Sequence, residues 1–123
     1  MADFLRCPAS GYNPIEATAP SGGYTAGVLY KVGDCWTQAF SDVAAAAVGV
    51  MIVEANRTMV AKATGSGESI TAGDRVYVNT TTKNVSKTKS SGDECVGYCT
   101  KDAGANDAKV EIALRGHESP DLT

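Results

Sequence analysis

Few side chains in this chain have the types that catalyse reactions, and they are widely spaced. Nucleophilic catalysis needs a serine or cysteine within hydrogen-bond reach of a base. The single histidine, His117, lies in a polar C-terminal stretch that contains glutamate and aspartate, so no serine–histidine site is indicated. The loop Thr64-Gly65-Ser66-Gly67 superficially resembles a phosphate-binding loop, but it lacks the Gly-Lys-Ser/Thr ending and a following helix. We therefore predict a glycine-rich hairpin loop there and a protein that is not an enzyme.

Three aspartates, Asp34, Asp74 and Asp93, each follow a glycine in a predicted turn. A short carboxylate in a turn accepts hydrogen bonds from nearby backbone amides. That role explains these residues without a calcium site or acid–base catalysis, and no metal or other cofactor is expected.

The four cysteines are Cys7, Cys35, Cys95 and Cys99. In a reducing cytosol we expect small buried hydrophobic side chains; disulfides and metal ligation are the alternatives. If residues 94–99 form a strand, Cys95 and Cys99 lie about 13 Å apart, whereas a disulfide needs Cα atoms within roughly 7 Å. A zinc site would normally have a Cys-x2-Cys pair or more histidines, so zinc is not supported.

Length and composition predict one soluble globular domain. The chain has 123 residues, of which 43% are hydrophobic and 20% charged, and a net charge of −3. Its lysines are not clustered as phosphate binding requires, so nucleic acid is not an expected partner. No apolar run reaches the roughly 18 residues of a membrane helix, and the N-terminus lacks a signal-peptide pattern. We therefore expect synthesis in the cytosol and no membrane partner.

Short strands between glycine-containing turns are predicted for the first half of the chain. Residues Thr25–Phe40 read as two strands joined by a turn at Gly33-Asp34. The nearly uniform apolar run Val48–Ala55 predicts a strand that is buried on both faces or lies inside an oligomer. A turn at Asn56-Arg57 is expected to lead into a further strand over 58–63, which would form a hairpin with a strand at Arg75–Val78.

The remaining segments complete the predicted pattern. The alanine-rich residues 41–47 are the best candidate for a short helix or helical turn. The polar stretch Thr80–Ser91 predicts either an edge hairpin or a mobile loop. Strands are expected at Glu94–Thr100 and Lys109–Arg115, and in the latter Val110, Ile112 and Leu114 face inward.

Together these elements predict a mainly β fold: a small β-barrel or β-sandwich of about seven short strands, with one short helix or helical turn. Residues 1–24 contain three prolines and are predicted to form an extended arm. Residues 25–116 are predicted to form a β-rich domain, and residues 117–123 a flexible tail. We expect the apolar residues along the arm either to pack on the chain's own core or to contact a partner. For Trp36 we likewise expect either a place in the core or a contact between subunits. The candidate partner-binding residues are Phe4, Leu5, Tyr12, Ile15, Tyr24 and Trp36.

Several blocks, taken in order, resemble the capsid decoration, or cement, proteins of tailed bacteriophages over about residues 25–116. The order of the blocks carries the resemblance, since each alone suits a generic β-turn. They are Tyr30-Lys31-Val32-Gly33-Asp34, the alanine-rich Asp42–Val48, Val60-Ala61-Lys62-Ala63-Thr64-Gly65, Ile70-Thr71-Ala72-Gly73-Asp74-Arg75-Val76-Tyr77-Val78, Val96-Gly97-Tyr98 and Val110-Glu111-Ile112-Ala113-Leu114.

The resemblance implies a structural virion protein on the exterior of a phage head, made in the host cytoplasm. Such proteins bridge neighbouring major capsid proteins and stabilise the shell, as homo-oligomers that are mostly trimers and sometimes dimers. The four cysteines and the polar stretch Thr80–Ser91 depart from the family pattern. The alternative interpretation is a small cysteine-stabilised secreted β module that binds a partner without catalysis.

Overall fold

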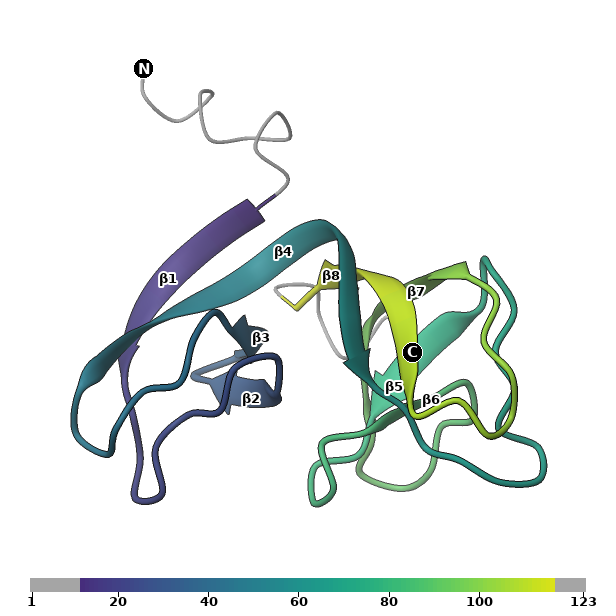
Figure 1. The fold of residues 1–123 in the computed structure, drawn as a ribbon, viewed down its shortest axis with the longest axis horizontal. Coiled ribbons are helices and arrows are strands. Elements are labelled where there is room, and N and C mark those ends of the chain that lie inside the picture. The colour runs from purple at the N-terminus through teal and green to yellow at the C-terminus, as the bar shows by residue number, and fades with distance from the viewer. Residues whose placement is uncertain (1–11, 117–123) are drawn as a thin grey trace.

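Strands form where β-branched and aromatic residues alternate between glycine-rich turns, and this pattern dominates the chain. The structure is a computed structural model that describes the backbone of residues 12–116 and side chains from Pro14 onward. Within this part there is no helix, so the predicted mainly β class is confirmed. The strands are β1 (Tyr12–Thr18), β2 (Leu29–Val32), β3 (Cys35–Ala39), β4 (Val48–Ala61), β5 (Arg75–Val78), β6 (Val85–Ser86), β7 (Glu94–Lys101) and β8 (Lys109–Arg115) (Figure 1).

The long strand β4 connects two lobes of one curled antiparallel sheet. The strand order is β2-β3-β4-β8-β7-β5-β6, with β1 paired to β4 as an additional strand. The first lobe, residues 12–55, contains β1, β2, β3 and the first half of β4, and the second lobe, residues 56–116, contains the remaining strands. Figure 1 shows β4 arching from one lobe to the other, so both lobes share the backbone of a single strand.

The turn predicted at Asn56-Arg57 is wrong, because β4 continues through these residues. Ala55 pairs with Leu114 and Thr58 pairs with Ile112, so two residues of β4 oppose one residue of β8. An extra residue on one strand is a β-bulge, which bends the strand and increases its twist. The bulge therefore bends β4 at the boundary of the lobes instead of ending it.

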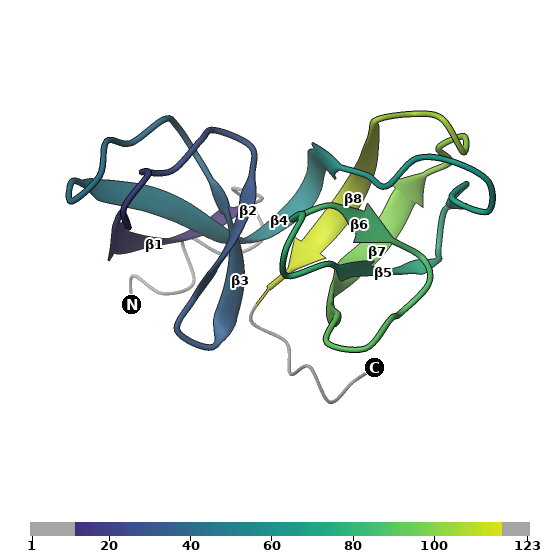
Figure 2. The same ribbon diagram turned by 90° about the horizontal axis from the view of Figure 1, so that it is seen from below.

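The second lobe curls into a half-barrel, seen from below in Figure 2. β4 pairs with β8, β8 with β7, β7 with β5, and β5 with the short β6. A parallel bridge between Lys62 and Val85 then brings the end of β4 beside β6, and the amide of Ala63 donates to the carbonyl of Val85 at 3.0 Å. Of the two alternatives for Thr80–Ser91, the structure shows the edge hairpin.

The hairpin predicted between residues 58–63 and Arg75–Val78 is also wrong. These segments lie in β4 and β5, and β8 and β7 lie between them in the sheet. Val60 pairs with Val110 of β8, and Val76 pairs with Gly97 of β7. Long-range pairing with β8 and β7 thus replaces the local pairing that the sequence suggested.

The short helix predicted over residues 41–47 does not form. This segment is a loop in which Val43 makes an antiparallel bridge with Tyr24. The Val43 amide donates to the Tyr24 carbonyl at 2.9 Å, and the Tyr24 amide donates back to Val43. These bonds use the backbone groups that a helix would need, and a helix of fewer than two turns is marginal on its own.

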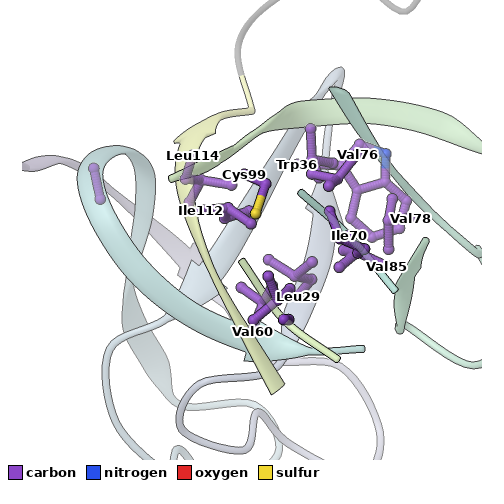
Figure 3. Close-up of a cluster of buried hydrophobic side chains, with 14 of the residues drawn as sticks. Leu29, Trp36, Val60, Ile70, Val76, Val78, Val85, Cys99, Ile112 and Leu114 are labelled. Carbon is purple, nitrogen blue, oxygen red and sulfur yellow. The ribbon is translucent and has the colours of Figure 1, made fainter. Parts of the chain in front are cut away.

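The buried side chains form two clusters on either side of β4. The larger cluster, shown in Figure 3, lies under the half-barrel and includes Leu29, Trp36, Val60, Ile112 and Leu114. The smaller cluster, within the first lobe, consists of Ala19, Tyr24, Ala39 and Met51. As predicted, Val110, Ile112 and Leu114 of β8 all face inward. Because Leu29 and Trp36 come from the first lobe, the larger core spans both lobes.

Residues 12–20 of the expected N-terminal arm belong to the protein's own sheet and core. Five residues of β1 pair with β4 in regular order from Pro14 opposite Ile52 to Thr18 opposite Val48, after an irregularity between Asn13 and Pro14. Ala19 is buried beside Met51. The part of the arm before residue 12 lies outside the described residues.

Candidate binding surfaces

Of the six predicted partner-binding residues, the structure describes the side chains of Ile15, Tyr24 and Trp36, and it does not gather these three into one surface. Phe4 and Leu5 lie outside the described residues, and Tyr12 begins β1 with a side chain that is not described. Ile15 is exposed on β1. Tyr24 and Trp36 are buried in this chain, in different clusters. The contact role of these residues therefore stays a prediction.

Tyr24 and Trp36 pack inside the chain and make specific polar contacts there. The Tyr24 ring lies 4.8 Å from the Tyr30 ring, centroid to centroid, and its hydroxyl donates to the Thr18 carbonyl at 3.4 Å. The Trp36 side chain is only 3% exposed, and Lys83 lies 5.5 Å from the ring centroid. Buried aromatic side chains of this kind contribute strongly to core packing.

Glu94 connects the two lobes through Trp36. The indole Nε1 of Trp36 on β3 donates to Glu94 Oε1 on β7 at 2.5 Å. Lys31 on β2 pairs with the same carboxylate at 3.0 Å. The hydrogen bond from Trp36 is the largest cause that lowers the pKa of Glu94 below its ordinary value; burial opposes it, and Lys31 and Lys89 add to the lowering. Side chains from β2 and β3 of the first lobe thus bind one carboxylate, Glu94, in the second lobe.

We expect the Glu94→Gln variant to lose stability in a pH-dependent way. Because the pKa of Glu94 is lower in the folded state than in the unfolded state, its ionised carboxylate stabilises the fold at pH values above the unfolded-state pKa. This stabilisation disappears as the pH falls through the folded-state pKa. At neutral pH the variant should unfold with a free energy lower by about 1 kcal/mol, the difference between a charged and a neutral acceptor. Urea titrations at pH 7 and in the acidic range measure the change. Asp34→Asn, at an exposed turn, is the control, and a loss that persists undiminished in acid would contradict the expectation.

An exposed apolar patch lies on the outer face of the first lobe, and we name it the Val48 patch. It consists of Phe40, Val48 and Val50, with Phe40 67% and Val48 63% exposed. The Phe40 amide donates to the Val50 carbonyl at 3.1 Å, which places these two residues side by side. Glu16 of β1 pairs with Val50 of β4, so a carboxylate borders the patch.

The second lobe carries a different exposed surface, the Tyr98 face, formed by Tyr98, Met59, Arg57, Arg75 and Arg115. Tyr98 is 45% exposed, and the guanidinium carbon of Arg115 lies 5.9 Å from its ring centroid. Arg75 lies directly opposite Tyr98 in the sheet. Met59 pairs with Glu111, and the exposed Arg57 lies 4.0 Å from the Glu111 carboxylate. Tyrosine and arginine are the residues that most often dominate protein–protein binding energy.

The sequence analysis predicted neither the Val48 patch nor the Tyr98 face, although one feature of the sequence indicated the Val48 patch. The apolar run Val48–Ala55 predicted either burial on both faces or a position inside an oligomer. The structure buries Met51, Ile52 and Val53 but exposes Val48 and Val50. Burial on both faces is therefore wrong for the start of the run, and the alternative, a position inside an oligomer, stays a prediction.

A polar hollow of about 600 Å³ lies between the 64–68 loop and the β5–β6 hairpin. Glu68 accepts a hydrogen bond from Ser86 there at 2.8 Å. The predicted local roles of two aspartates are confirmed nearby, because Asp74 accepts from the Thr71 amide at 2.9 Å and Asp93 from the Ser90 amide at 3.0 Å. Hydroxyls and amides dominate the lining, so the hollow presents mainly hydrogen-bonding groups.

The described cysteines, Cys35, Cys95 and Cys99, are not joined to one another by disulfide bonds. Cys99 is buried, and burial is the main cause that raises the pKa of its thiol. Between residues 12 and 116 no group of three or more histidine, cysteine, aspartate or glutamate side chains could hold a metal ion. The same residues contain no helix long and apolar enough to cross a membrane.

These features define a small, mainly β protein whose prominent surfaces are outward-facing patches of apolar and arginine side chains. A sequence model of the phage cement protein family matches residues 9–115, and the chain belongs to that family. No curated protein and no solved structure gave a match. Family membership makes the protein a structural protein associated with a phage capsid, as the resemblance in the sequence suggested.

Proposed function

We propose that this protein binds the outer surface of a phage head, bridges neighbouring major capsid proteins and stabilises the shell. It is made in the host cytoplasm, acts as a homo-oligomer, with a trimer favoured over a dimer, and has no catalytic activity. The match to the phage cement protein family over residues 9–115 is the observation that carries this proposal.

The surfaces of the described residues support a role in protein–protein contact. Six large hydrophobic side chains are exposed: Ile15, Phe40, Val48, Val50, Met59 and Tyr98. Isolated exposed hydrophobic residues are normal, but apolar residues gathered in a patch typically mark an interaction site. Many weak contacts of this kind, repeated over a capsid, add up through multivalency.

The direct test mixes purified protein with heads that lack it. We expect saturable binding, visible as added density between capsomers in electron micrographs, and a higher temperature of head disruption. Binding of a ligand to the assembled state stabilises that state by mass action. A protein that ignores heads, or binds without raising their thermal stability, would refute the proposal.

The N-terminal segment offers a second test, for which the structure fixes the right boundary. Deletion of residues 2–11 leaves β1 and the buried Ala19 in place, whereas a deletion through residue 20 would also remove a strand of the sheet. We propose that Phe4 and Leu5 in this segment contact the shell or the next protomer. The 2–11 deletion should fold normally and lower head occupancy at least about tenfold, the effect of about 1.4 kcal/mol of lost contact.

Binding isotherms on heads measure the occupancy, and circular dichroism checks the fold. The double variant Phe4→Ser, Leu5→Ser is the matched control for length, because it keeps the segment and removes only its large apolar side chains. Equal binding by the wild type and the 2–11 deletion would exclude the segment from the contact.

A further inference from the structure

We propose that copies of this protein associate head to tail, with the Val48 patch of one copy seated on the Tyr98 face of the next. The inference deepens the oligomeric part of the proposed function by naming the two surfaces that meet. Its test in solution does not depend on capsid binding.

The first argument is that both surfaces expose large apolar side chains and lie on different lobes. The Val48 patch presents three large side chains on adjoining strands of the first lobe. The Tyr98 face presents Tyr98 and Met59 on the outer side of the second lobe. In Figure 1 the two lobes stand apart along the length of β4, so one copy offers both surfaces at once.

The second argument is that the lobes carry opposite charge. The first lobe has one basic residue against four acidic ones, a formal charge of −3, and the second has nine basic against seven acidic, a formal charge of +2. The Val48 patch is bordered by Glu16. The Tyr98 face contains three arginines, all those among the residues that the structure describes. Two of them lie near carboxylates of the same chain, Arg57 at 4.0 Å from Glu111 and Arg115 at 3.5 Å from Glu54, so the face keeps an excess of positive charge.

These charges distinguish the possible pairings. Contact between two Val48 patches would bring two acidic lobes together, and contact between two Tyr98 faces would bring two sets of arginines together. Like charges across an interface are unfavourable, and complementary ones fix the pairing and its register. Only the contact of unlike surfaces places Glu16 beside arginines while covering the apolar side chains on both partners.

The geometric consequence is a heterologous interface. An interface between unlike surfaces leaves one free surface on each end of a dimer, so further copies add until the ring closes. A closed ring of identical copies would cover every Val48 patch and every Tyr98 face.

Two variants test the pairing. Phe40→Asp with Val48→Asp introduces charge into the patch, and Tyr98→Asp with Met59→Asp does so in the face. The full chain is studied by analytical ultracentrifugation, and Ser91→Asp in the exposed 87–91 loop serves as the control. We expect the control to assemble like the wild type, and each test variant to associate at least about 30-fold more weakly.

The equimolar mixture of the two variants gives the decisive result. The intact patch of one variant can meet the intact face of the other, so the mixture should form a dimer that grows no further. We also expect wild-type assembly to weaken as salt is raised, because the contact joins opposite charges. Circular dichroism establishes that each variant is folded, and Phe40→Ser and Tyr98→Ser replace the aspartate variants if these do not fold.

Three outcomes would overturn the inference. Loss of assembly in the patch variant alone would indicate a symmetric contact of two patches. Unchanged assembly in both variants would assign the surfaces to another protein, and a monomeric wild type would exclude the contact altogether. In each case, head binding measured on the same samples shows separately whether the proposed function holds.

Discussion

Replacement of Gly97 by alanine is expected to cost about 3–5 kcal/mol of unfolding free energy, in the range that marks severe core disruption. Gly97 lies on β7 between β5 and β8, paired with Val76 on one side and Leu114 on the other. A Cβ at this position would lie 1.9 Å from the Ala113 carbonyl oxygen, and the φ angle of 153° is one that other residues rarely adopt. The obstacle is backbone of a central strand, so the sheet must separate to accommodate the methyl group.

Urea unfolding followed through the fluorescence of Trp36, the single tryptophan, measures this loss. Gly92→Ala is the matched control, because Gly92 has a φ of 88° but open space where a Cβ would be. That control isolates the backbone strain, which costs about 1–2 kcal/mol. If Gly97→Ala and Gly92→Ala lost equal stability, the collision with Ala113 would be excluded as the cause.

Replacement of Lys62 by methionine is expected to destabilise the fold by about 2–4 kcal/mol, because it removes the hydrogen bonds of a buried charged donor, and such bonds contribute about 1.5–3 kcal/mol. Lys62 is 2% exposed at the seam of the half-barrel. Its Nζ donates to the carbonyls of Ala63 at 2.8 Å, Ala105 at 3.1 Å and Asp107 at 3.3 Å. Methionine fills a similar volume but cannot donate these bonds, so the loop that carries Ala105 and Asp107 is held only by backbone hydrogen bonds, such as that from the Gly65 amide to the Ala105 carbonyl at 3.0 Å.

The control for charge and length is Lys109→Met, at an exposed position on β8 next to the same strand. We expect it to change the unfolding free energy by less than about 0.5 kcal/mol, as is usual for surface positions. Thermal unfolding of both variants, with hydrogen exchange of residues 103–108, checks the expectation. A Lys62→Met protein as stable as Lys109→Met, with the loop still protected, would show that the three bonds contribute little.

These two positions explain how a small domain can serve as a rigid capsid component. A glycine allows β7 to approach β8 closely, and a buried lysine fastens a loop across the seam. Both lie within blocks on which the resemblance to cement proteins was recognised, Val60–Gly65 and Val96–Tyr98. The roles found here are internal, so these blocks maintain the scaffold that presents the outer surfaces.

The candidate surfaces were harder to predict than the strands. Aromatic residues were chosen as contacts because of their type, yet Tyr24 and Trp36 are buried in this chain. Phe40 and Tyr98 have the same type and are exposed. A side chain's exposure depends on which face of its strand it occupies and on what covers that face, and the second condition is set by residues far away in the chain.

The sequence alone determined the features that depend on near neighbours. Alternation of apolar and polar residues defined β2, β3, β7 and β8, and Gly-Asp pairs marked turns in which Asp74 and Asp93 bond to nearby amides. The order of these local blocks also indicated the family. The strand and turn signals are each contained in a few consecutive residues, and the order of the blocks is read directly along the chain, so no knowledge of the fold was needed.

The tertiary structure alone decided which segments pair. It made one bent strand of residues 48–61, separated β4 from β5 by two other strands, and used the backbone of Val43 for a bridge instead of a helix. For β4 and β5, long-range pairing prevails because it buries the apolar faces of β7 and β8, which local hairpins would leave exposed. The same pairing leaves the Val48 patch and the Tyr98 face uncovered on opposite lobes.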